Sequence, residues 1–229
     1  NVSEKIAVYV ALGIDITGQK EVIGFWEGES ESSSFWYGIL EELKQRGVKD
    51  ILFLCTDWIS GFKEILEQSF PKSIYQRCIV HIIRNLTKCL PRKNWQEFCN
   101  DLKTIYKSTD IESAKEASKV VLEKWKKNII LCKKLKQDIP HMLQLYDYTP
   151  SIRRLVYTTN PIESMNSALR KVTNGKGSFV NEQALEKVLY LRIKELQENW
   201  IKKKINKWSE ILNELLIMHG ERVEKYIEL

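Results

Sequence analysis

A change of pattern near residue 81 most constrains what this chain can fold into. Before it, short β-rich segments alternate with segments of helical spacing; after it, residues 82–146 are lysine-rich, helical in spacing and free of strand signals. A chain of 229 residues that is 43% hydrophobic can bury a sizeable core. The pattern therefore predicts an α/β domain that carries a helical insertion.

Two β-rich segments come first, over residues 6–14 and 21–26. Turn-forming residues 17–20 separate them, which predicts a hairpin. Apolar residues at helical spacing then predict a helix over residues 34–46, and Gly47 is suited to end it.

The next three segments predict a parallel pair of strands. Residues 50–55 are apolar after the first residue, as in a strand that is covered on both faces. A helix is expected over residues 59–68 and another strand over 72–78. Strand, helix and strand in this order imply a right-handed crossover within one sheet.

The rest of the chain is predicted to be helical. Pro91, Pro140 and Pro150 punctuate the insertion. A further helix is expected to begin at Pro161, and two more to span residues 182–200 and 201–219. We therefore divide the chain into three parts, which are an α/β core (1–81), a helical insertion (82–150) and a C-terminal helical part (151–229).

Charge and cysteine content narrow the class of protein. Residues 1–80 carry 12 acidic and 8 basic side chains, so the net charge of +6 comes from the rest of the chain. The excess suggests a polyanionic partner such as nucleic acid, or simply solvated lysine-rich helices. No apolar run approaches the roughly 18 residues of a membrane span. Five cysteines, without a CxxC pair, indicate reduced thiols in a cytoplasm.

Asp57 lies two residues beyond the apolar strand that ends at Cys55. Ligands of open parallel sheets bind outside the carboxyl ends of the strands, and a carboxylate there suits Mg²⁺ or Mn²⁺. The structural alternative is an aspartate that starts a turn or caps the helix expected near Ile59.

Glu163 also has two interpretations. Asn160 is a good helix cap, Pro161 suits the first helical position, and Glu163 stands where a capping box places its carboxylate. A structural role would therefore explain this segment without any chemistry.

The helix that contains Glu163 nevertheless has two distinct faces. One face is an apolar stripe of Ile162, Met165, Leu169 and Val172. The other face is polar and could bind a metal-bound phosphodiester, with the glutamate on the metal and the cations on phosphate oxygens; it comprises Glu163, Asn166, Ser167 and Arg170, followed by Lys171.

Cys78 and His81 have metal-like spacing but are only two ligands, whereas structural zinc usually needs four. Cys89, Cys99 and His141 could complete a set. The alternative is a buried thiol at a strand end and a histidine at a helix start.

Several tryptophans interleave with lysines, a composition that can bind nucleic acid strands but more often reflects buried tryptophans beside a solvated face; they are Trp58, Trp95, Trp125, Trp200 and Trp208.

Taken together, the motifs resemble those of the mutator-type transposases of bacterial insertion sequences, from about Ile6 to the C-terminus. Gln76-Arg77-Cys78-x-x-His81 and Thr158-Thr159-Asn160-x-x-Glu163 are the most specific blocks, and their joint occurrence is stronger than either alone. The other matching segments are Tyr9–Asp15 (YVALGID), Lys20–Trp26 (KEVIGFW), Gly28–Ser30, Phe35–Trp36, Leu43–Asp50, Asp57 with Gly61-Phe62, and Arg84-Asn85.

The resemblance implies an RNase H-like fold with a mixed sheet, and a DDE-type enzyme in which two Asp and one Glu bind two Mg²⁺ or Mn²⁺ ions. Asp57 matches the second Asp and Glu163 matches the Glu, while Cys78 and His81 match a family signature. The implied reaction is DNA strand cleavage and strand transfer at insertion-sequence ends. Side chains expected to contact the DNA are Asn160, Asn166, Arg170 and Lys171.

One departure from the family concerns the first Asp, which lies on a strand upstream of the block that matches Tyr9–Asp15. We expect this chain to be N-terminally truncated, without that Asp or the DNA-binding region, and inactive or nearly so by itself. Asp15 is predicted to lie at the hairpin turn and not to take the role of the first catalytic Asp. Trp58 stands where a glycine often follows the second Asp.

Three other functions are considered. The first is a non-catalytic DNA-binding or regulatory remnant of a transposase. The second is an RNase H-like nuclease or junction resolvase, against which the long insertion and the Thr158–Glu163 block argue. The third is a helical interaction domain. For the transposase we expect terminal-repeat and target DNA as partners, a homo-oligomer without membrane association, and a cytoplasmic, nucleoid-associated location.

Overall fold

The computed structural model describes residues 6–28, 32–157, 160–174, 179–201 and 204–227; the side chains of residues 160, 161 and 201 are not described. The chain divides into two compact units. We call residues 1–31 and 159–229 the hairpin unit, and residues 32–158 the helical unit. The three-part division made from the sequence stays a prediction.

The hairpin unit begins with an antiparallel pair, β1 (Ala7–Ile14) and β2 (Lys20–Gly28), which confirms the predicted hairpin. The register shifts between Ala11 and Leu12. Asp15 closes the turn, because its Oδ1 accepts hydrogen bonds from the backbone N–H groups of Thr17 (2.8 Å) and Gln19 (2.9 Å). Asp15 is therefore a turn residue, as predicted.

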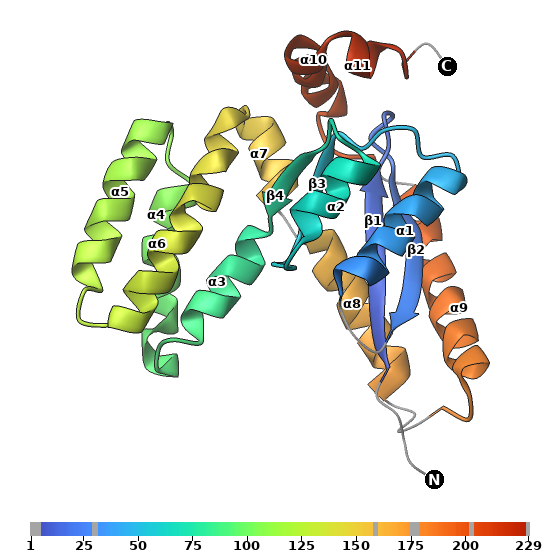
Figure 1. Cartoon of the computed structure of the whole chain (residues 1–229), viewed down its shortest axis with the longest axis horizontal. Helices are drawn as coiled ribbons and strands as arrows, with labels where there is room; N and C mark the ends of the chain where they lie inside the picture. Colours follow the sequence, from blue (N-terminus) through green and yellow to red (C-terminus); the bar gives the residue numbers. More distant parts are fainter. Residues whose placement is uncertain (1–5, 29–31, 158–159, 175–178, 202–203, 228–229) are drawn as a thin grey trace. The chain divides into compact units, whose positions relative to one another are not determined.

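Two long helices, α8 (Asn160–Thr173) and α9 (Glu182–Ile201), pack against this hairpin (Figure 1). Met165 and Leu169 of α8 and Leu189 and Ile193 of α9 are buried. They form what we call the hairpin cluster with half-buried residues that include Val8, Val10, Leu12, Val22 and Phe25 from the strands. Register places these five strand residues on one face of the hairpin, so the strands offer the helices one apolar surface.

Two short helices, α10 (Trp208–His219) and α11 (Glu221–Glu224), complete the hairpin unit. The helix predicted from residue 201 therefore starts later. Trp208 Nε1 donates a hydrogen bond to the carbonyl of Ile16 (2.9 Å), and the N–H of Ile205 donates one to Gly18 (3.1 Å). These bonds tie the segment before α10 to the hairpin turn.

The helical unit begins with α1 (Ser33–Gln45), β3 (Phe53–Thr56), α2 (Phe62–Ser69) and β4 (Ile74–Arg77). β3 and β4 are parallel, as predicted. β3 is shorter than expected and incompletely covered, with half-buried residues and an exposed Cys55. Its one strand partner among the described residues is β4, which explains why it is less buried than a central strand.

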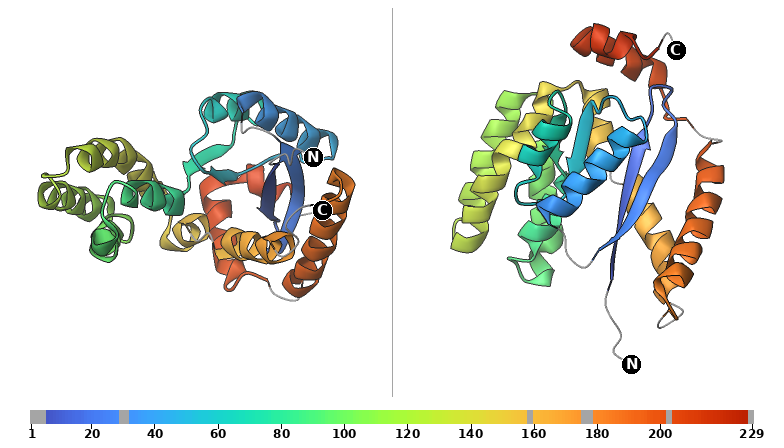
Figure 2. Two further views of the ribbon diagram at one scale, coloured as in Figure 1. Left: turned by 90° about the horizontal axis from the view of Figure 1, so that it is seen from below. Right: turned by 45° about the vertical axis from the view of Figure 1, so that its right-hand side comes forward.

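Helices fill the rest of this unit, confirming the predicted helical stretch (Figure 2). The first begins at residue 79 rather than 82. Pro140 lies inside α6 and does not punctuate the stretch as expected, whereas Pro150 begins α7. The elements are α3 (Ile79–Thr87), η1 (Arg92–Asn94), α4 (Trp95–Tyr106), α5 (Ile111–Lys124), α6 (Ile129–Leu143), η2 (Gln144–Asp147) and α7 (Pro150–Tyr157).

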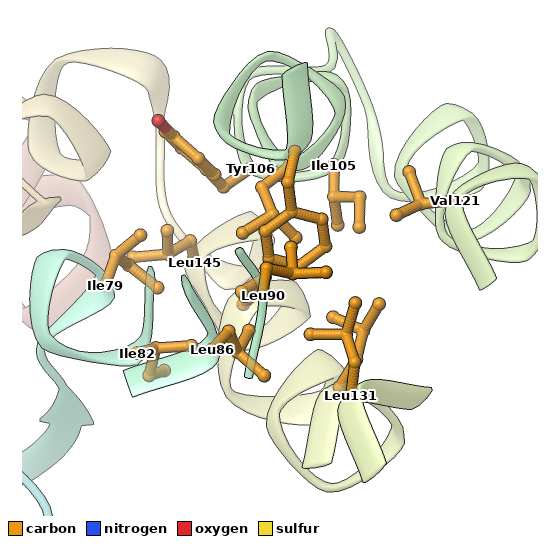
Figure 3. Close-up of a cluster of buried hydrophobic side chains, with 13 residues drawn as sticks. Ile79, Ile82, Leu86, Leu90, Ile105, Tyr106, Val121, Leu131 and Leu145 are labelled. Carbon is orange, nitrogen blue, oxygen red and sulfur yellow. The ribbon is translucent and has the colours of Figure 1, made fainter. Parts of the chain in front are cut away.

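These helices enclose a large apolar core, which we call the helical cluster (Figure 3). Leu86, Phe98, Leu102, Ile105 and Leu131 have no exposed surface. The remaining members are Ile79, Ile82, Leu90, Tyr106, Val121, Leu135, Met142 and Leu145.

The architecture is thus mixed α/β, as predicted. Among the residues described, the four strands pair as two separate two-stranded sheets, one antiparallel and one parallel. The RNase H-like arrangement of a single mixed sheet stays a prediction. A search of the described helices finds none long and apolar enough for a membrane span.

Candidate active site

Asp57 comes directly after β3, at the edge of the sheet where the parallel strands β3 and β4 both end. Its Oδ1 accepts a hydrogen bond from the backbone N–H of Trp58 (2.7 Å). Its carbonyl accepts hydrogen bonds from the hydroxyls of Thr56 (2.8 Å) and Tyr75 (3.4 Å). Both the carboxylate and the backbone are therefore held at the strand end.

The alternative that Asp57 caps the following helix is wrong. α2 begins at Phe62, and its cap residue is Gly61, which makes no side-chain hydrogen bond. Asp57 does form a local turn contact with Trp58, so the turn alternative survives. This local bond goes to Oδ1 and does not use the other carboxylate oxygen, Oδ2.

Asp57 therefore satisfies the chemical requirement for a divalent-cation ligand. Asp57 is half-buried, so the residue is still partly open to solvent. A hard carboxylate oxygen is the ligand that Mg²⁺ and Mn²⁺ prefer. The position outside the carboxyl ends of two parallel strands is also the usual place for a ligand in a parallel sheet.

Glu163 lies in the first turn of α8 and is exposed. The predicted two-faced character of this helix is confirmed. Met165 has no exposed surface and Leu169 is 6% exposed, while Asn166, Ser167, Arg170 and Lys171 are all exposed. A carboxylate near the helix N-terminus and two cations in its last turn also agree with the helix dipole.

Part of the predicted site falls outside what the structure describes. Thr158 and Thr159 lie outside the described residues, and Asn160 begins α8 without a described side chain. The capping-box alternative for Glu163 depends on these residues and stays open. Asp57 belongs to the helical unit and Glu163 to the hairpin unit, so a shared cation stays a prediction.

Cys78 and His81 lie just beyond β4, where Cys78 is buried and precedes the first residue of α3. The N–H of Cys78 donates a hydrogen bond to the carbonyl of Thr56 (2.7 Å), which joins the end of β4 to the strand that carries Asp57. Hydrogen bonding with Cys55, and then with His81, lowers the pKa of the Cys78 thiol. The hydrogen bond with Cys78 in turn raises the pKa of His81.

Zinc is not supported at Cys78 and His81. Within the ranges that the structure covers, no three His, Cys, Asp or Glu side chains are grouped so that they could hold a metal ion. What the structure does show is that Cys78 follows β4 directly and that His81 lies in the first turn of α3, at the carboxyl end of the same two strands that position Asp57.

Trp58 was noted in the sequence, but the contacts that surround its ring were not predicted. The Trp58 side chain is 58% exposed, and the guanidinium of Arg77 lies over its ring, 4.3 Å from the centroid. Arg77 Nη1 also donates a hydrogen bond to Asp138 Oδ1 (2.8 Å). No sequence motif could have revealed this pair, because 61 residues separate its members.

Three of the other lysine-flanked tryptophans follow the structural alternative more closely, whereas Trp95 is 39% exposed. Trp200 is half-buried against the hairpin cluster, and Trp208 is anchored to the hairpin turn. Trp125 packs against the helical cluster and donates a hydrogen bond to Asp101 (2.8 Å). Lys204 and Lys207, between Trp200 and Trp208, are exposed. The segment therefore supplies core contacts from its tryptophans and charge from its lysines.

Comparison with known proteins agrees with the motifs. The sequence profile of the family described as "Transposase, Mutator family" matches residues 1–203. The chain is 34% identical over 218 residues to the transposase for insertion sequence element ISRM3 of Rhizobium meliloti, covering 94% of this chain and 54% of that protein.

Two further relatives come from other bacteria. A probable insertion-sequence transposase of Corynebacterium diphtheriae is 28% identical to this chain, in an alignment that covers 96% of this chain and 70% of that protein. The IS256 transposase of transposon Tn4001 from Staphylococcus aureus is 29% identical to this chain, in an alignment that covers 84% of this chain and 50% of that protein. The chain thus spans about half the length of the Rhizobium and Staphylococcus relatives. With the family profile matched over most of its residues, the chain belongs to the Mutator family of transposases.

Proposed function

We propose that this chain supplies the catalytic region of a DDE-type DNA transposase that acts at insertion-sequence ends with Mg²⁺ or Mn²⁺. The observation that carries the proposal is the position of Asp57 in a chain of this family. Its carboxylate follows a parallel strand, and the local bond from the Trp58 N–H goes to only one of its two oxygens.

Asp57 and Glu163 would hold the metal in this proposal. When bound, the metal would stabilise the negative charge that develops on the phosphodiester and on its leaving oxygen. Arg170 and Lys171, exposed in the last turn of α8, would bind phosphate oxygens of the DNA. Asn160 and Asn166 belong to the same helix and are proposed to contact the DNA as well.

The reaction would proceed in two in-line displacements at phosphorus. In the first, water attacks a phosphodiester at the element end, the bond to the 3′-oxygen breaks, and a free 3′-hydroxyl remains. In the second, that hydroxyl attacks a phosphodiester of the target, whose own 3′-oxygen leaves. The cations of α8 would hold the charged backbone in place through both displacements.

The alternative of a non-catalytic DNA-binding remnant is not favoured, since carboxylates are present at both motif positions, Asp57 and Glu163. A homo-oligomeric assembly and a cytoplasmic location stay predictions.

The proposal is tested by Mn²⁺ binding to the 229-residue chain, followed by electron paramagnetic resonance. Asp57→Asn and Glu163→Gln should each weaken Mn²⁺ binding about tenfold or more. If the two carboxylates share a site, the loss of Mn²⁺ affinity in the double variant should be smaller than the sum of the losses in the two single variants. Glu198→Gln on α9 is the matched control, because Glu198 is also exposed on a helix of the hairpin unit.

Nicking of supercoiled plasmid in Mn²⁺ gives the second readout, and it should be weak because the chain by itself is expected to be inactive or nearly so. Any nicking that is detected should decrease in Asp57→Asn and Glu163→Gln and persist in the Glu198 control. Mn²⁺ binding that both variants leave unchanged would show that these carboxylates hold no metal. Strictly additive losses would instead assign them to separate ions.

A further inference from the structure

Trp58 is an exposed aromatic side chain held in a defined orientation. Its backbone N–H is bonded to the carboxylate of Asp57, so the residue is fixed directly beside the proposed metal ligand. One face of the indole is covered by the guanidinium of Arg77, 4.3 Å from the ring centroid. Trp58 is still 58% exposed, so the part of the indole that Arg77 does not cover is largely open to solvent.

The cation behind the indole is itself held in place. Arg77 and Asp138 form an ion pair of 2.8 Å, and each of the two side chains is only 12% exposed. Asp138 belongs to α6, and His141 of the same helix lies near the indole, with the ring centroids 6.4 Å apart. Helix α6, which is distant in sequence, thus holds the Arg77 guanidinium against the Trp58 ring.

A hydrogen bond at His141 links helix α6 to strand β4, which carries Arg77. The carbonyl of His141 accepts a hydrogen bond from Gln76 Nε2 (2.9 Å), and Gln76 is fully buried in β4. Burial, and then the charge of Arg77, lower the pKa of His141, which favours its neutral form. The positive charge at the ring therefore comes from Arg77, which Asp138 balances.

We propose that the open face of Trp58 is a stacking site for an unpaired nucleobase of the DNA strand that is bound at Asp57. This inference rests on the proposed function. A flat, exposed indole offers a stacking surface to any base, and a guanidinium on its other face adds a cation–π contact that keeps the ring in place. A base within a duplex already has both faces stacked, so the ligand must be single-stranded or flipped out.

The charge balance separates this site from a phosphate-binding site. Arg77 is paired with Asp138, so the group around Trp58 carries no net positive charge with which to attract a phosphate. The site should therefore recognise the base rather than the backbone. Losing the indole should lower affinity without changing the salt dependence of binding, whereas losing a phosphate-binding lysine would change both.

The experiment measures binding of the 229-residue chain to a fluorescent single-stranded oligonucleotide, in EDTA, at several salt concentrations. A second oligonucleotide has the same backbone with abasic sites in place of its bases. Trp58→Ala should weaken binding of the intact strand about 5- to 150-fold, the range expected for one base stacked on an aromatic ring. It should leave the affinity for the abasic strand and the salt slope unchanged, and Trp58→Phe should restore part of the loss.

Trp95→Ala is the matched control, since Trp95 is another exposed tryptophan of the same unit and is not beside Asp57. It should bind both strands as the unchanged chain does. The proposal is overturned if the unchanged chain binds intact and abasic strands equally, or if Trp58→Ala weakens both to the same extent. Because EDTA removes the metal, failure here leaves the Mn²⁺ result untouched, and a negative Mn²⁺ result leaves the stacking result untouched.

Discussion

The two units differ in how completely they bury their side chains. In the helical cluster, residues from several helices surround one another, and Leu86, Phe98 and Leu131 have no exposed surface. In the hairpin cluster, Met165 is fully buried, but the strand residues that pack against the helices are half-buried. The comparison shows that a bundle of helices buries apolar residues on every side, whereas a two-stranded hairpin offers its helices only one apolar face.

The same substitution in both units should measure this difference. Leu131→Ala leaves a cavity among neighbours that are themselves buried, so we expect a loss of about 4 kcal/mol in the free energy of unfolding. Leu169→Ala removes the same atoms from a side chain that is 6% exposed beside half-buried neighbours, and we expect about 2–3 kcal/mol. Hydrogen exchange followed by mass spectrometry measures each loss in its own unit.

The comparison would fail if Leu169→Ala cost as much as Leu131→Ala, since the hairpin cluster would then be as tightly packed as the helical cluster. An Ile129→Ala variant is the control for helix α6, because Ile129 is 79% exposed and should change stability little.

Local patterns predicted most of the individual elements. The hairpin, the parallel pair β3 and β4, and the helical stretch after residue 81 follow from alternation, apolar runs and helical spacing. The errors are at boundaries. β3 proved shorter than its apolar run because a strand extends only where its partner provides hydrogen bonds, and α10 begins seven residues after its predicted start.

The candidate site was predictable where it depends on local sequence. Asp57 at a strand end and the two faces of α8 could be derived from a few neighbouring residues. The Arg77–Asp138 pair and the exposure of Trp58 could not, because they depend on how α6 packs against β4, and no local pattern encodes such a contact. Among the five lysine-flanked tryptophans, composition alone did not distinguish the exposed Trp58 from the anchored Trp208.

Two turn glycines offer a second test of the comparison. Gly18 of the hairpin unit (φ 80°) and Gly47 of the helical unit (φ 97°) both adopt left-handed conformations. Gly47→Ala should cost about 1 kcal/mol for the backbone alone, because a methyl group there would meet open space. Gly18→Ala should cost roughly 2–3 kcal/mol, because the methyl group would also overlap the indole of Trp208.

Thermal unfolding of the two glycine variants gives the measurement, with Gly38→Ala as the control. Gly38 lies in α1, has no positive φ, and has open space for a methyl group, so alanine there should be neutral or stabilising. Equal losses at Gly18 and Gly47 would mean that Trp208 moves aside at little cost, and that the segment before α10 is only loosely attached to the hairpin.

The smallest effect concerns two helix caps, one in each unit. The N–H of Ser113 donates a hydrogen bond to Asp110 at the start of α5, and the N–H of Ala184 donates one to Asn181 at the start of α9. The bonds from the Ser113 N–H and hydroxyl, and from Thr109, lower the pKa of Asp110 to about 2. A carboxyl group whose pKa is lowered by folding stabilises the folded state above its unfolded pKa, and this contribution disappears as the pH falls through the folded value.

Acid should therefore loosen α5 but not α9 through these caps, because the amide of Asn181 does not titrate in this range. Between about pH 4 and pH 2, amides in the first turn of α5 should lose protection against hydrogen exchange relative to those of α9, after correction for the intrinsic rate at each pH. Asp110→Asn should make the two helices respond alike, since an asparagine can still cap but cannot be protonated. If α5 in that variant still loosened with acid, the cause would lie in other carboxylates of the helical unit, and Asp110 would be a structural cap without any role in the acid response.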